Sequence, residues 1–429
     1  MFHKGWFINS ALQDRKPKTK DFELTMPPTE RLYYADSHLI EFEARVIDKT
    51  ERVSSWTAVI LDRTAFYPTG GGQPSDTGTL DGARVVECID DGDNGVLHVT
   101  QGRTLEVGST VKGRVDWPRR FDHIQQHTGQ HILSQAFITL FKAATHSFRV
   151  LDHSCEIDVE LANPTSEIIE KAVSLANNVI WEDRPLTIRQ VTAQQAADLT
   201  LRKESTREGE LRLIEIDGFD LTPCGGTHAY RTGEVGMIAV RSWERAKGLV
   251  RIEFVAGMRA LDDYRVANKT ARNVAALFSA GRDDTAPLVK RLLDENKDLH
   301  RRVRALEEIA SRVEADELLA NAAPDASGVR IVSNIAENLD GEHLKRIAVA
   351  LIAHPKTIAL LGSRQKDKAR IVFARSADLT GNMNQLVRDA CAMLDGRGGG
   401  RPELAEGGGS NVSKLELAIE TARQSLTVR

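Results

Sequence analysis

Short apolar runs with alternating polar positions follow one another over the first quarter of the chain. TAVILD, ARVVECI and GVLHVT are examples, and glycines or Asp-Gly pairs separate such runs. A period of two is typical of half-buried strands, and closely spaced turns between short strands are typical of barrels. We therefore expect a small β-barrel from Leu32 to about Trp117.

Longer periods appear between residues 121 and 258. Apolar positions recur at steps of three and four from His123 to Phe141 and predict an amphipathic helix, and EIIEKAVSLANNVIWE predicts another. The stretch VRSWERAKGLVRIEFVAG has the pattern of strand, turn and strand. Helices mixed with strands in this way predict an α+β core.

After Gly257 the pattern becomes helical. A heptad seam spans nearly four repeats, at Val289, Leu292, Asn296, Leu299, Val303, Leu306, Ala310 and Val313. It predicts a coiled coil or a helical hairpin, with Asn296 at an a-type position where a buried amide fixes register. A helix packed against its own domain, or a hairpin with the helix near residues 316 to 322, would cover the same stripe. We expect a homodimer to which this helix contributes.

From Gly328 onward, strand-like and helical segments alternate. VRIVSNI, TIALLGS and RIVFARS have strand character, whereas EHLKRIAVALIAH and MNQLVRDACAML have helical character, and Pro324 marks the boundary. The expected fold class is α+β, with a C-terminal α/β domain. The expected parts are a weakly ordered extension (1–27), a β-barrel (28–120), a metal-binding core (121–258), a helical coiled-coil linker (259–323) and the C-terminal domain (324–429).

Composition narrows the class of protein. A chain of 429 residues with 41% hydrophobic positions can bury sizeable cores. Four cysteines provide no disulfide framework and indicate a reducing compartment. No apolar run approaches bilayer length and the start has no signal-peptide core, so we expect a cytoplasmic protein with no membrane partner. Met26 offers a second possible start, and the chain is too short to hold an aminoacylation domain ahead of it.

Two short pairs of metal-ligating residues stand out. His127 and His131 lie four residues apart, so a helix presents both imidazoles on one face. Cys224 and His228 are also four apart, and the two glycines between them let the chain fold tightly around an ion. Three nitrogens and one thiolate match the tetrahedral preference of Zn²⁺, and we expect one ion per chain. The other cysteines lack a histidine at ligand spacing and are expected to be small buried side chains: Cys88, Cys155 and Cys391.

These pairs belong to longer motifs. FYPTGGGQPSDTG at Phe66 to Gly78, together with HTGQH and CGGTH, closely resembles the editing domain of alanyl-tRNA synthetase and its free-standing relatives, the alanyl-tRNA-editing proteins. GRGGGRPELAEGGG at Gly396 to Gly409 resembles the glycine-rich stretch of the DHH-associated C-terminal domain of the synthetase and the longer editing proteins. The resemblance covers roughly residues 28 to 429. It implies an aminoacyl-tRNA deacylase that removes serine or glycine wrongly esterified to the 3′ adenosine of tRNA(Ala).

The resemblance suggests roles for residues around the first motif. A site that hydrogen-bonds the serine hydroxyl can reject alanine, and Thr64 and Thr69 offer hydroxyls for this purpose. The family often carries an acidic or amide residue where Thr69 stands, which leaves its role open. Gln73 has an amide able to donate and accept near the ester. Three glycines would let the backbone approach the nucleotide: Gly70, Gly71 and Gly72.

Two further features concern charge. Asp220 either orients a ligand histidine or pairs with the substrate ammonium. A net charge of −4 leaves RNA binding undecided, because affinity for phosphate depends on local basic patches. One candidate patch for tRNA comprises Arg241, Arg245 and Lys247, with Arg251 assigned to the substrate. A solvated hairpin is the alternative for this patch.

The sequence leaves two catalytic roles for the metal open. The metal either lowers the pKa of a bound water toward ~7 or holds the substrate while water attacks from elsewhere. A metallopeptidase is disfavoured because HTGQH lacks the general-base glutamate of HExxH. A threonyl-type editing or ligase-associated domain shares the metal pairs but not GGGQP or the C-terminal glycines. A non-catalytic, zinc-dependent tRNA-binding module is the main alternative, and the preference between serine and glycine is undecided.

Overall fold

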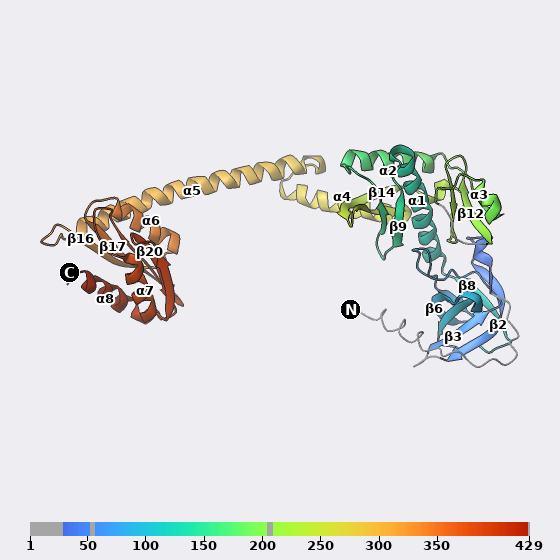
Figure 1. The fold of residues 1–429 in the computed structure, drawn as a ribbon, viewed down its shortest axis with the longest axis horizontal. Coiled ribbons are helices and arrows are strands. Elements are labelled where there is room, and N and C mark those ends of the chain that lie inside the picture. The colour runs from blue at the N-terminus through green and yellow to red at the C-terminus, as the bar shows by residue number, and fades with distance from the viewer. Residues whose placement is uncertain (1–28, 52–55, 204–208, 428–429) are drawn as a thin grey trace. The chain divides into compact units, whose positions relative to one another are not determined.

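The computed structural model of the chain describes residues 29–51, 56–203 and 209–427, and the extension expected at residues 1–27 lies outside these ranges. By its internal contacts the chain divides into two compact units, Met1–Asn273 and Val274–Arg429 (Figure 1). Within the described ranges, no helix combines the length and the apolar character needed to cross a membrane. Each unit has hydrophobic cores of its own.

Six antiparallel strands close into a barrel in the order β2-β3-β7-β6-β5-β8. Their bounds are β2 (Glu41–Glu51), β3 (Trp56–Leu61), β5 (Gly78–Leu80), β6 (Ala83–Asp90), β7 (Val96–Gln101) and β8 (Thr110–Val115). Apolar side chains such as Val59, Leu61 and Val85 fill the interior. The predicted small barrel is confirmed. Short elements accompany it: β1 (Glu30–Arg31), η2 (Leu32–Tyr34), β4 (Arg63–Thr64) and η3 (Gly92–Asn94).

The metal-binding core packs one long helix, α1 (Trp117–Phe141), against two sheets. The first sheet has the order β14-β15-β10-β9, and the second has the order β11-β12-β13. The strands are β9 (Thr145–Val150), β10 (Cys155–Val159), β11 (Leu186–Thr192), β12 (Glu210–Ile216), β13 (Asp220–Pro223), β14 (Ile238–Ala246) and β15 (Leu249–Ala256). The remaining elements are α2 (Ser166–Trp181), α3 (Ala193–Ala197) and η4 (Thr232–Val235). The expected α+β core is thus observed.

Helix α1 differs from its prediction in two ways. It begins at Trp117 rather than His123, because Pro118 stands in the first turn, where its missing N–H has no partner to lose. It is also buried on nearly all sides from His123 to Phe137, polar residues included, rather than amphipathic. A buried polar side chain needs a partner, so the middle of α1 is a place where hydrogen bonds and ligands are concentrated.

The second unit holds a five-stranded sheet with the order β16-β17-β18-β20-β19 (Figure 1). Its elements are β16 (Arg330–Glu337), α6 (Gly341–Ile352), β17 (Thr357–Gln365), β18 (Lys368–Arg375), α7 (Met383–Met393), β19 (Gly396–Gly400), β20 (Leu404–Gly409), η6 (Val412–Lys414) and α8 (Leu415–Thr427). The expected α/β domain is therefore present. The glycine-rich stretch forms the β19–β20 hairpin, where a Cβ on Gly407 would lie 2.5 Å from Cys391 Sγ.

Three helical elements precede this sheet: α4 (Gly257–Leu277), η5 (Arg282–Asp284) and α5 (Thr285–Asn321). Residues 316 to 321 continue α5, so the hairpin considered for the heptad seam does not form. The C-terminal part of α5 packs on α6 through Ala315 and Leu319. The seam itself is exposed, with Leu299 and Leu306 at 56% and 65% exposure.

Candidate functional site

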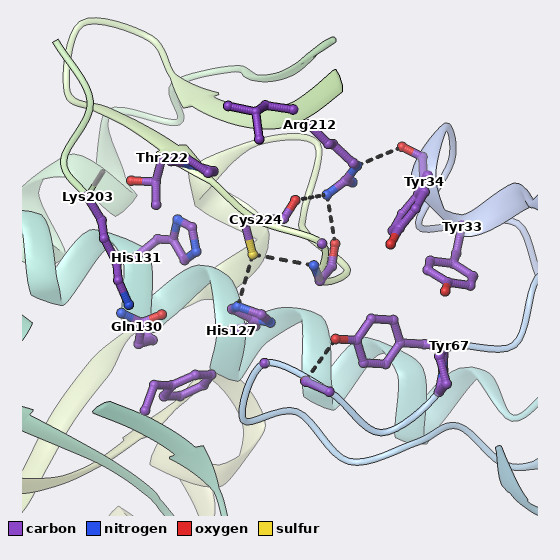
Figure 2. Close-up of a pocket in the computed structure, with 18 of the residues that line it drawn as sticks. Tyr33, Tyr34, Tyr67, His127, Gln130, His131, Lys203, Arg212, Thr222 and Cys224 are labelled. Atoms are coloured by element: carbon purple, nitrogen blue, oxygen red, sulfur yellow. Dashed lines mark hydrogen bonds between the residues drawn. The ribbon is translucent and has the colours of Figure 1, made fainter. Parts of the chain in front are cut away.

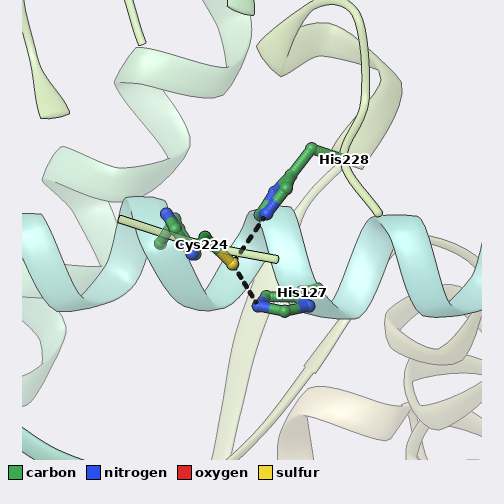
Figure 3. Close-up of side chains that lie close together, drawn as sticks. His127, Cys224 and His228 are labelled. Atoms are coloured by element: carbon green, nitrogen blue, oxygen red, sulfur yellow. Dashed lines mark hydrogen bonds between the residues drawn. The ribbon is translucent and has the colours of Figure 1, made fainter. Parts of the chain in front are cut away.

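Four potential metal ligands from distant segments meet at one point (Figure 3). One ligand atom from each of His127, His131, Cys224 and His228 lies within 4.8 Å of the others, and we call these residues the metal cluster. Cys224 Sγ lies 3.4 Å from Nε2 of His127 and 3.3 Å from Nε2 of His228. The three imidazoles are buried and the cysteine is half-buried. The structure thus brings together the two pairs that were singled out by their spacing.

Helix and loop geometry position the cluster. His127 and His131 lie one turn apart on α1, and Cys224 directly follows β13. The Cys224 N–H donates to the carbonyl oxygen of Arg212, at 3.0 Å, which ties the loop to β12. Gly226 passes so close to α1 that an added Cβ would lie 2.2 Å from Cε1 of His127. Only glycine therefore lets the Cys-Gly-Gly-Thr-His loop approach the helix this closely.

The barrel side of the molecule holds the first histidine. Nδ1 of His127 lies 2.8 Å from Oε1 of Gln73, and Nε2 of Gln73 donates to Oγ1 of Thr227 at 2.9 Å. Gln73 is buried and is not part of the pocket lining. Both ends of its amide are engaged, so its contacts orient His127 and do not reach into the pocket where an ester was expected to meet it.

The core holds the other two histidines. Oδ2 of Asp220 lies 3.2 Å from Nδ1 of His131, and its Oδ1 accepts from Nε of Arg202 at 2.8 Å. Nδ1 of His228 lies 3.4 Å from Oγ1 of Thr128. Of the two roles left open for Asp220, these contacts correspond to orienting a histidine, because its carboxylate is buried and lies outside the pocket lining.

Electrostatics favour the metal-binding protonation state at two of the four ligands, Cys224 and His228. Burial raises the pKa of the Cys224 thiol, but the adjacent His127 and His228 outweigh burial and hold that pKa well below its ordinary value. Burial lowers the pKa of His228 to about 3. Burial also raises the pKa of Asp220, but His131 and Arg202 reverse this and lower it to about 2. Burial lowers the pKa of His131, but Asp220 and Cys224 outweigh burial and raise it. Cys224 and His228, but not His131, are thus shifted toward the protonation states that accept a metal.

The donor set fits Zn²⁺. Ordinary zinc bonds of about 2.0 Å to nitrogen and 2.3 Å to sulfur, at tetrahedral angles, put the two donors roughly 3.5 Å apart. The two Sγ to Nε2 distances, 3.4 and 3.3 Å, agree with that separation. Because the Nδ1 atoms of all three histidines have other partners, one nitrogen of each ring remains for the ion. The number, type and spacing of the donors all suit a tetrahedral ion.

Three members of the cluster, His127, His131 and Cys224, line a pocket of about 690 Å³ (Figure 2). The side chains that Figure 2 labels fall on two sides of Cys224: three tyrosines lie on one, and Gln130, His131 and Lys203 lie on the other. Gln130 comes from α1, one residue before His131, and its Nε2 donates to Oγ of Ser134 at 2.8 Å. The pocket therefore has an aromatic end and a polar end with metal ligands between them.

The glycine turn of the first motif forms part of the pocket wall. Thr69, Gly70 and Gly71 line the pocket, and Oγ1 of Thr69 accepts the N–H of Ser75 at 3.1 Å. Gly72 has a φ of +83°, and an added Cβ would lie 2.2 Å from the carbonyl oxygen of Phe148. Gly72 therefore packs against β9 and, unlike Gly70 and Gly71, does not line the pocket.

Thr64 lies elsewhere than expected. Its Oγ1 is 2.8 Å from Nε2 of His98 and accepts the N–H of Phe66 at 3.1 Å, and the residue is fully buried. Burial lowers the pKa of His98 to about 4, so this pair is neutral. Thr64 on β4 thus contacts His98 on β7 and lies outside the pocket lining, so its role at the substrate hydroxyl stays a prediction that these contacts do not support.

The expected basic patch is largely paired. Arg241 contacts the carboxylates of Glu253 and Asp263, each at 3.1 Å. Arg245 donates to the carbonyl oxygen of Ala162 at 3.0 Å, and Lys247 occupies the exposed β14–β15 turn. The strand, turn and strand pattern is thus correct. The acidic partners of Arg241 reduce the positive charge that tRNA would meet there, whereas Arg245 bonds to a neutral carbonyl oxygen and keeps its charge.

Arg251 does not reach the pocket. Its Nε and Nη2 donate to the two carboxylate oxygens of Asp158, at 2.9 and 3.1 Å, across the β10–β15 pair. This guanidinium is not among the pocket-lining groups, so its assignment to the substrate stays a prediction that the pocket does not support.

Several residues that line the pocket were not among those singled out from the sequence. Gln130 lies inside HTGQH and could have been chosen from its place between two ligands on one helix. Arg212 and Tyr34 could not have been chosen from the sequence, since Arg212 lies on strand β12 and Tyr34 on a short 3₁₀ helix, and neither belongs to a motif. Arg212 donates to the carbonyl oxygens of Tyr34, Cys224 and Gly226, at 3.0, 2.7 and 3.1 Å. It thus joins the loop from Cys224 to His228, which we call the metal loop, to the segment around Tyr34.

Comparison with known families matches three regions of the chain. Residues 9–119 match the tRNA synthetases class II (A), and residues 211–253 match the threonyl and alanyl tRNA synthetase second additional domain. Residues 328–427 match the DHHA1 domain. The second of these regions contains Cys224 and His228.

Individual relatives extend the match over nearly the whole chain. The alanyl-tRNA editing protein AlaX-L of Pyrococcus horikoshii is 29% identical over 411 residues, which cover 93% of this chain and all of that protein. The alanine–tRNA ligases of Methanoregula boonei and Methanoculleus marisnigri are 33% and 32% identical over 94% of this chain. The chain spans only 44% of the length of each ligase. The C-Ala domain of Aquifex aeolicus alanyl-tRNA synthetase, a solved structure, is 27% identical over 22% of this chain and 89% of that one, with a TM-score of 0.22.

Proposed function

The chain belongs to the family that unites alanyl-tRNA editing proteins with the corresponding parts of alanine–tRNA ligases, and on that premise we propose that it deacylates mischarged tRNA(Ala). The substrate would be serine, and also glycine, esterified to the 3′ adenosine. The observation that carries this proposal is the metal cluster in the wall of a pocket with one polar and one aromatic end. An aminoacyl adenosine likewise has a small polar part and a flat apolar part joined at the ester.

The reaction requires water to attack the ester carbonyl carbon, after which the C–O bond breaks and the ribose oxygen leaves with a proton. When held by His127, His131, Cys224 and His228, Zn²⁺ would supply positive charge that polarises a carbonyl or lowers the pKa of a water. Gln73 and Asp220 act as positioning residues, because they fix the rings of His127 and His131. Because the imidazole rings are already oriented, they do not need to reorganise as charge develops during the reaction.

Selection against alanine requires a polar partner for the serine hydroxyl. Gln130 replaces Thr64 in this role, because it lines the pocket beside His131 whereas Thr64 faces His98. A site built to hydrogen-bond a hydroxyl rejects the analogue that lacks it by as much as ~10⁴-fold or more, since its own polar groups are then left unpaired. Replacing Gln130 by Leu should therefore reduce the preference for serine over alanine.

The rest of the chain would serve tRNA recognition. The barrel and core, residues 28–258, would form the editing half, and the domain at 324–429 would add affinity for tRNA(Ala). Residues 259–323 would link them and form the contact of a homodimer through the exposed seam on α5. Because charged tRNA is made and used in the cytoplasm, the protein would work there.

The decisive experiment measures hydrolysis of Ser-tRNA(Ala), Gly-tRNA(Ala) and Ala-tRNA(Ala) by zinc-loaded and chelated protein. We expect Ser-tRNA(Ala) to be hydrolysed much faster than Ala-tRNA(Ala), and chelation or the substitution His131→Ala to abolish the activity. His153→Ala is the matched control, because His153 is exposed and lies outside the cluster. Equal rates on seryl and alanyl substrates would contradict the editing assignment. Zinc-dependent binding of tRNA with no hydrolysis would instead identify a non-catalytic binding module.

A further inference from the structure

The aromatic end of the pocket is built from three tyrosines that contact one another. The ring centroid of Tyr33 lies 4.9 Å from that of Tyr34 and 5.4 Å from that of Tyr67, with near-perpendicular planes. We call this group the tyrosine wall. Tyr33 and Tyr67 are buried, whereas Tyr34 is partly exposed to the pocket. The wall therefore offers an aromatic surface that a ligand can reach through Tyr34 (Figure 2).

Two guanidinium groups accompany Tyr34. The Cζ atoms of Arg212 and Arg31 lie 5.3 and 5.7 Å from its ring centroid. Arg31 also lines the pocket and is held by both carboxylate oxygens of Asp90, at 2.8 and 2.7 Å. Rings and guanidinium planes both stack with flat partners. This end of the pocket is thus lined by several flat groups held in place.

The tyrosine wall is fixed relative to the metal cluster. Arg212 donates to the carbonyl oxygen of Tyr34 and also to those of Cys224 and Gly226 in the metal loop. Tyr67 donates its hydroxyl to the carbonyl oxygen of Gly70 at 2.9 Å. A ligand that touched both the wall and the cluster would therefore meet two surfaces at a set separation.

The charges select the class of ligand. The three hydrogen-bond acceptors of Arg212 are carbonyl oxygens, and its Nη2 is buried without a partner in the described part of the chain. A cation at the wall would meet this guanidinium, whose hydrogen-bond acceptors are neutral, and would be repelled. A neutral heteroaromatic ring suits the wall better, because it stacks on rings and guanidinium planes and its ring nitrogens can accept hydrogen bonds from nearby donors.

We infer that the tyrosine wall, through Tyr34, holds the base of the terminal adenosine of the tRNA while the ester lies at the metal cluster. This inference rests on the proposed function and adds the orientation of the substrate. The ribose would then lie between the wall and Cys224, and the amino acid would point toward Gln130. Stacking reads the flat face of a base rather than its edge, so any purine at this position should bind.

The test is a binding cycle with uncharged tRNA, so it does not depend on hydrolysis. Affinities at one salt concentration are measured for complete tRNA(Ala) and for the same tRNA without its terminal adenosine. With unmodified protein, loss of the adenosine should weaken binding roughly tenfold. In Tyr34→Ala the complete tRNA should bind roughly tenfold more weakly and the shortened tRNA unchanged. Tyr34→Phe keeps the ring and should behave like the unmodified protein.

Each outcome decides the inference. If Tyr34→Ala weakens both tRNAs equally, Tyr34 contacts another part of the RNA, such as a phosphate, and the inference fails. If it weakens neither, the wall does not bind tRNA. Retained zinc in Tyr34→Ala and in the bulkier Tyr34→Leu excludes loss of fold as the cause. Hydrolysis of Ser-tRNA(Ala) is measured separately, where Tyr34→Ala should raise KM more than it lowers kcat. A protein that binds as described but hydrolyses nothing would refute the proposed function and keep this inference.

Discussion

Arg120 joins the barrel to the helix that carries two of the metal ligands, and its removal gives a sharp test of the architecture. The side chains of Arg120 and Asp76 are both completely buried and form an ion pair. Nη1 of Arg120 donates to the carbonyl oxygen of Ser37 at 2.7 Å, and Nη2 donates to that of Ala65. Asp76 also accepts the backbone N–H of Tyr67 at 2.6 Å. A single guanidinium thus gathers three segments from the barrel side against the start of α1.

The expected cost of Arg120→Met follows from these contacts. Breaking a buried ion pair on one side leaves an uncompensated carboxylate and costs about 3–5 kcal/mol of unfolding free energy. Two carbonyl oxygens also lose a donor. For a unit of this size, about 2–4 °C of melting temperature corresponds to each kcal/mol, so the transition should fall by about 6–20 °C. The double variant Asp76→Asn with Arg120→Met should recover part of the loss, because no unpaired charge then remains.

Calorimetry on the full chain provides the assay. The transition of the first unit is identified as the one that rises when zinc is added. Arg84→Met is the matched control, because Arg84 pairs with Asp116 at 2.7 Å while the two side chains are 49% and 36% exposed. A pair in that setting contributes about 0–1 kcal/mol. A shift for Arg120→Met no larger than that for Arg84→Met would refute the reasoning.

Four further predictions concern the site and the assembly. Gln73→Leu should weaken zinc affinity by about 10–100-fold in a chelator competition, whereas unchanged affinity with a lower kcat would restore a direct role at the ester. In metal-free protein, iodoacetamide should alkylate Cys224 at a pH below that needed for an ordinary thiol, because its pKa is held low, and added zinc should block this reaction. Deleting residues 325–429 should lower tRNA affinity and leave one zinc per chain, and unchanged affinity would assign recognition to the first unit. Leu299→Glu with Leu306→Glu should separate a dimer without unfolding it, and light scattering that shows a monomer for the unmodified protein would exclude the dimer.

Local pattern was sufficient for much of the fold. The barrel, the core helices and the C-terminal α/β domain each repeat apolar positions with the period of their own structure, so periodicity predicts them. The glycine-rich stretch was not predicted to form strands, because glycine weakens a strand in isolation. In the folded domain this hairpin packs so closely against Cys391 that there is no room for a Cβ at Gly398 or Gly407. Glycine is therefore required at these positions by tertiary packing, which local pattern does not reveal.

In the candidate site, too, local features could be predicted from the sequence and long-range contacts could not. The four metal ligands could be chosen because each pair is local, at helical or loop spacing. Gln73 and Asp220 were also singled out, but which histidine each one contacts could not be predicted, since Gln73 stands 54 residues from His127 and Asp220 stands 89 residues from His131. Hydrogen bonds over such separations depend on tertiary structure. The contact between Thr64 and His98, 34 residues apart, depends on tertiary structure in the same way.

Ser37 contacts both the loop that carries Cys224 and His228 and the buried Arg120 on α1. Its Oγ accepts the N–H of His228 at 3.1 Å, and its carbonyl oxygen accepts a hydrogen bond from Arg120. Binding of Zn²⁺ by the cluster would therefore be coupled to the packing of the barrel against the core, and such coupling acts equally in both directions. An ion present at 100 times its Kd would add about 2.7 kcal/mol to the assembled form. A cell short of zinc would hold more of this protein with its barrel loosened from the core, so metal supply would set the amount of competent protein as well as its chemistry.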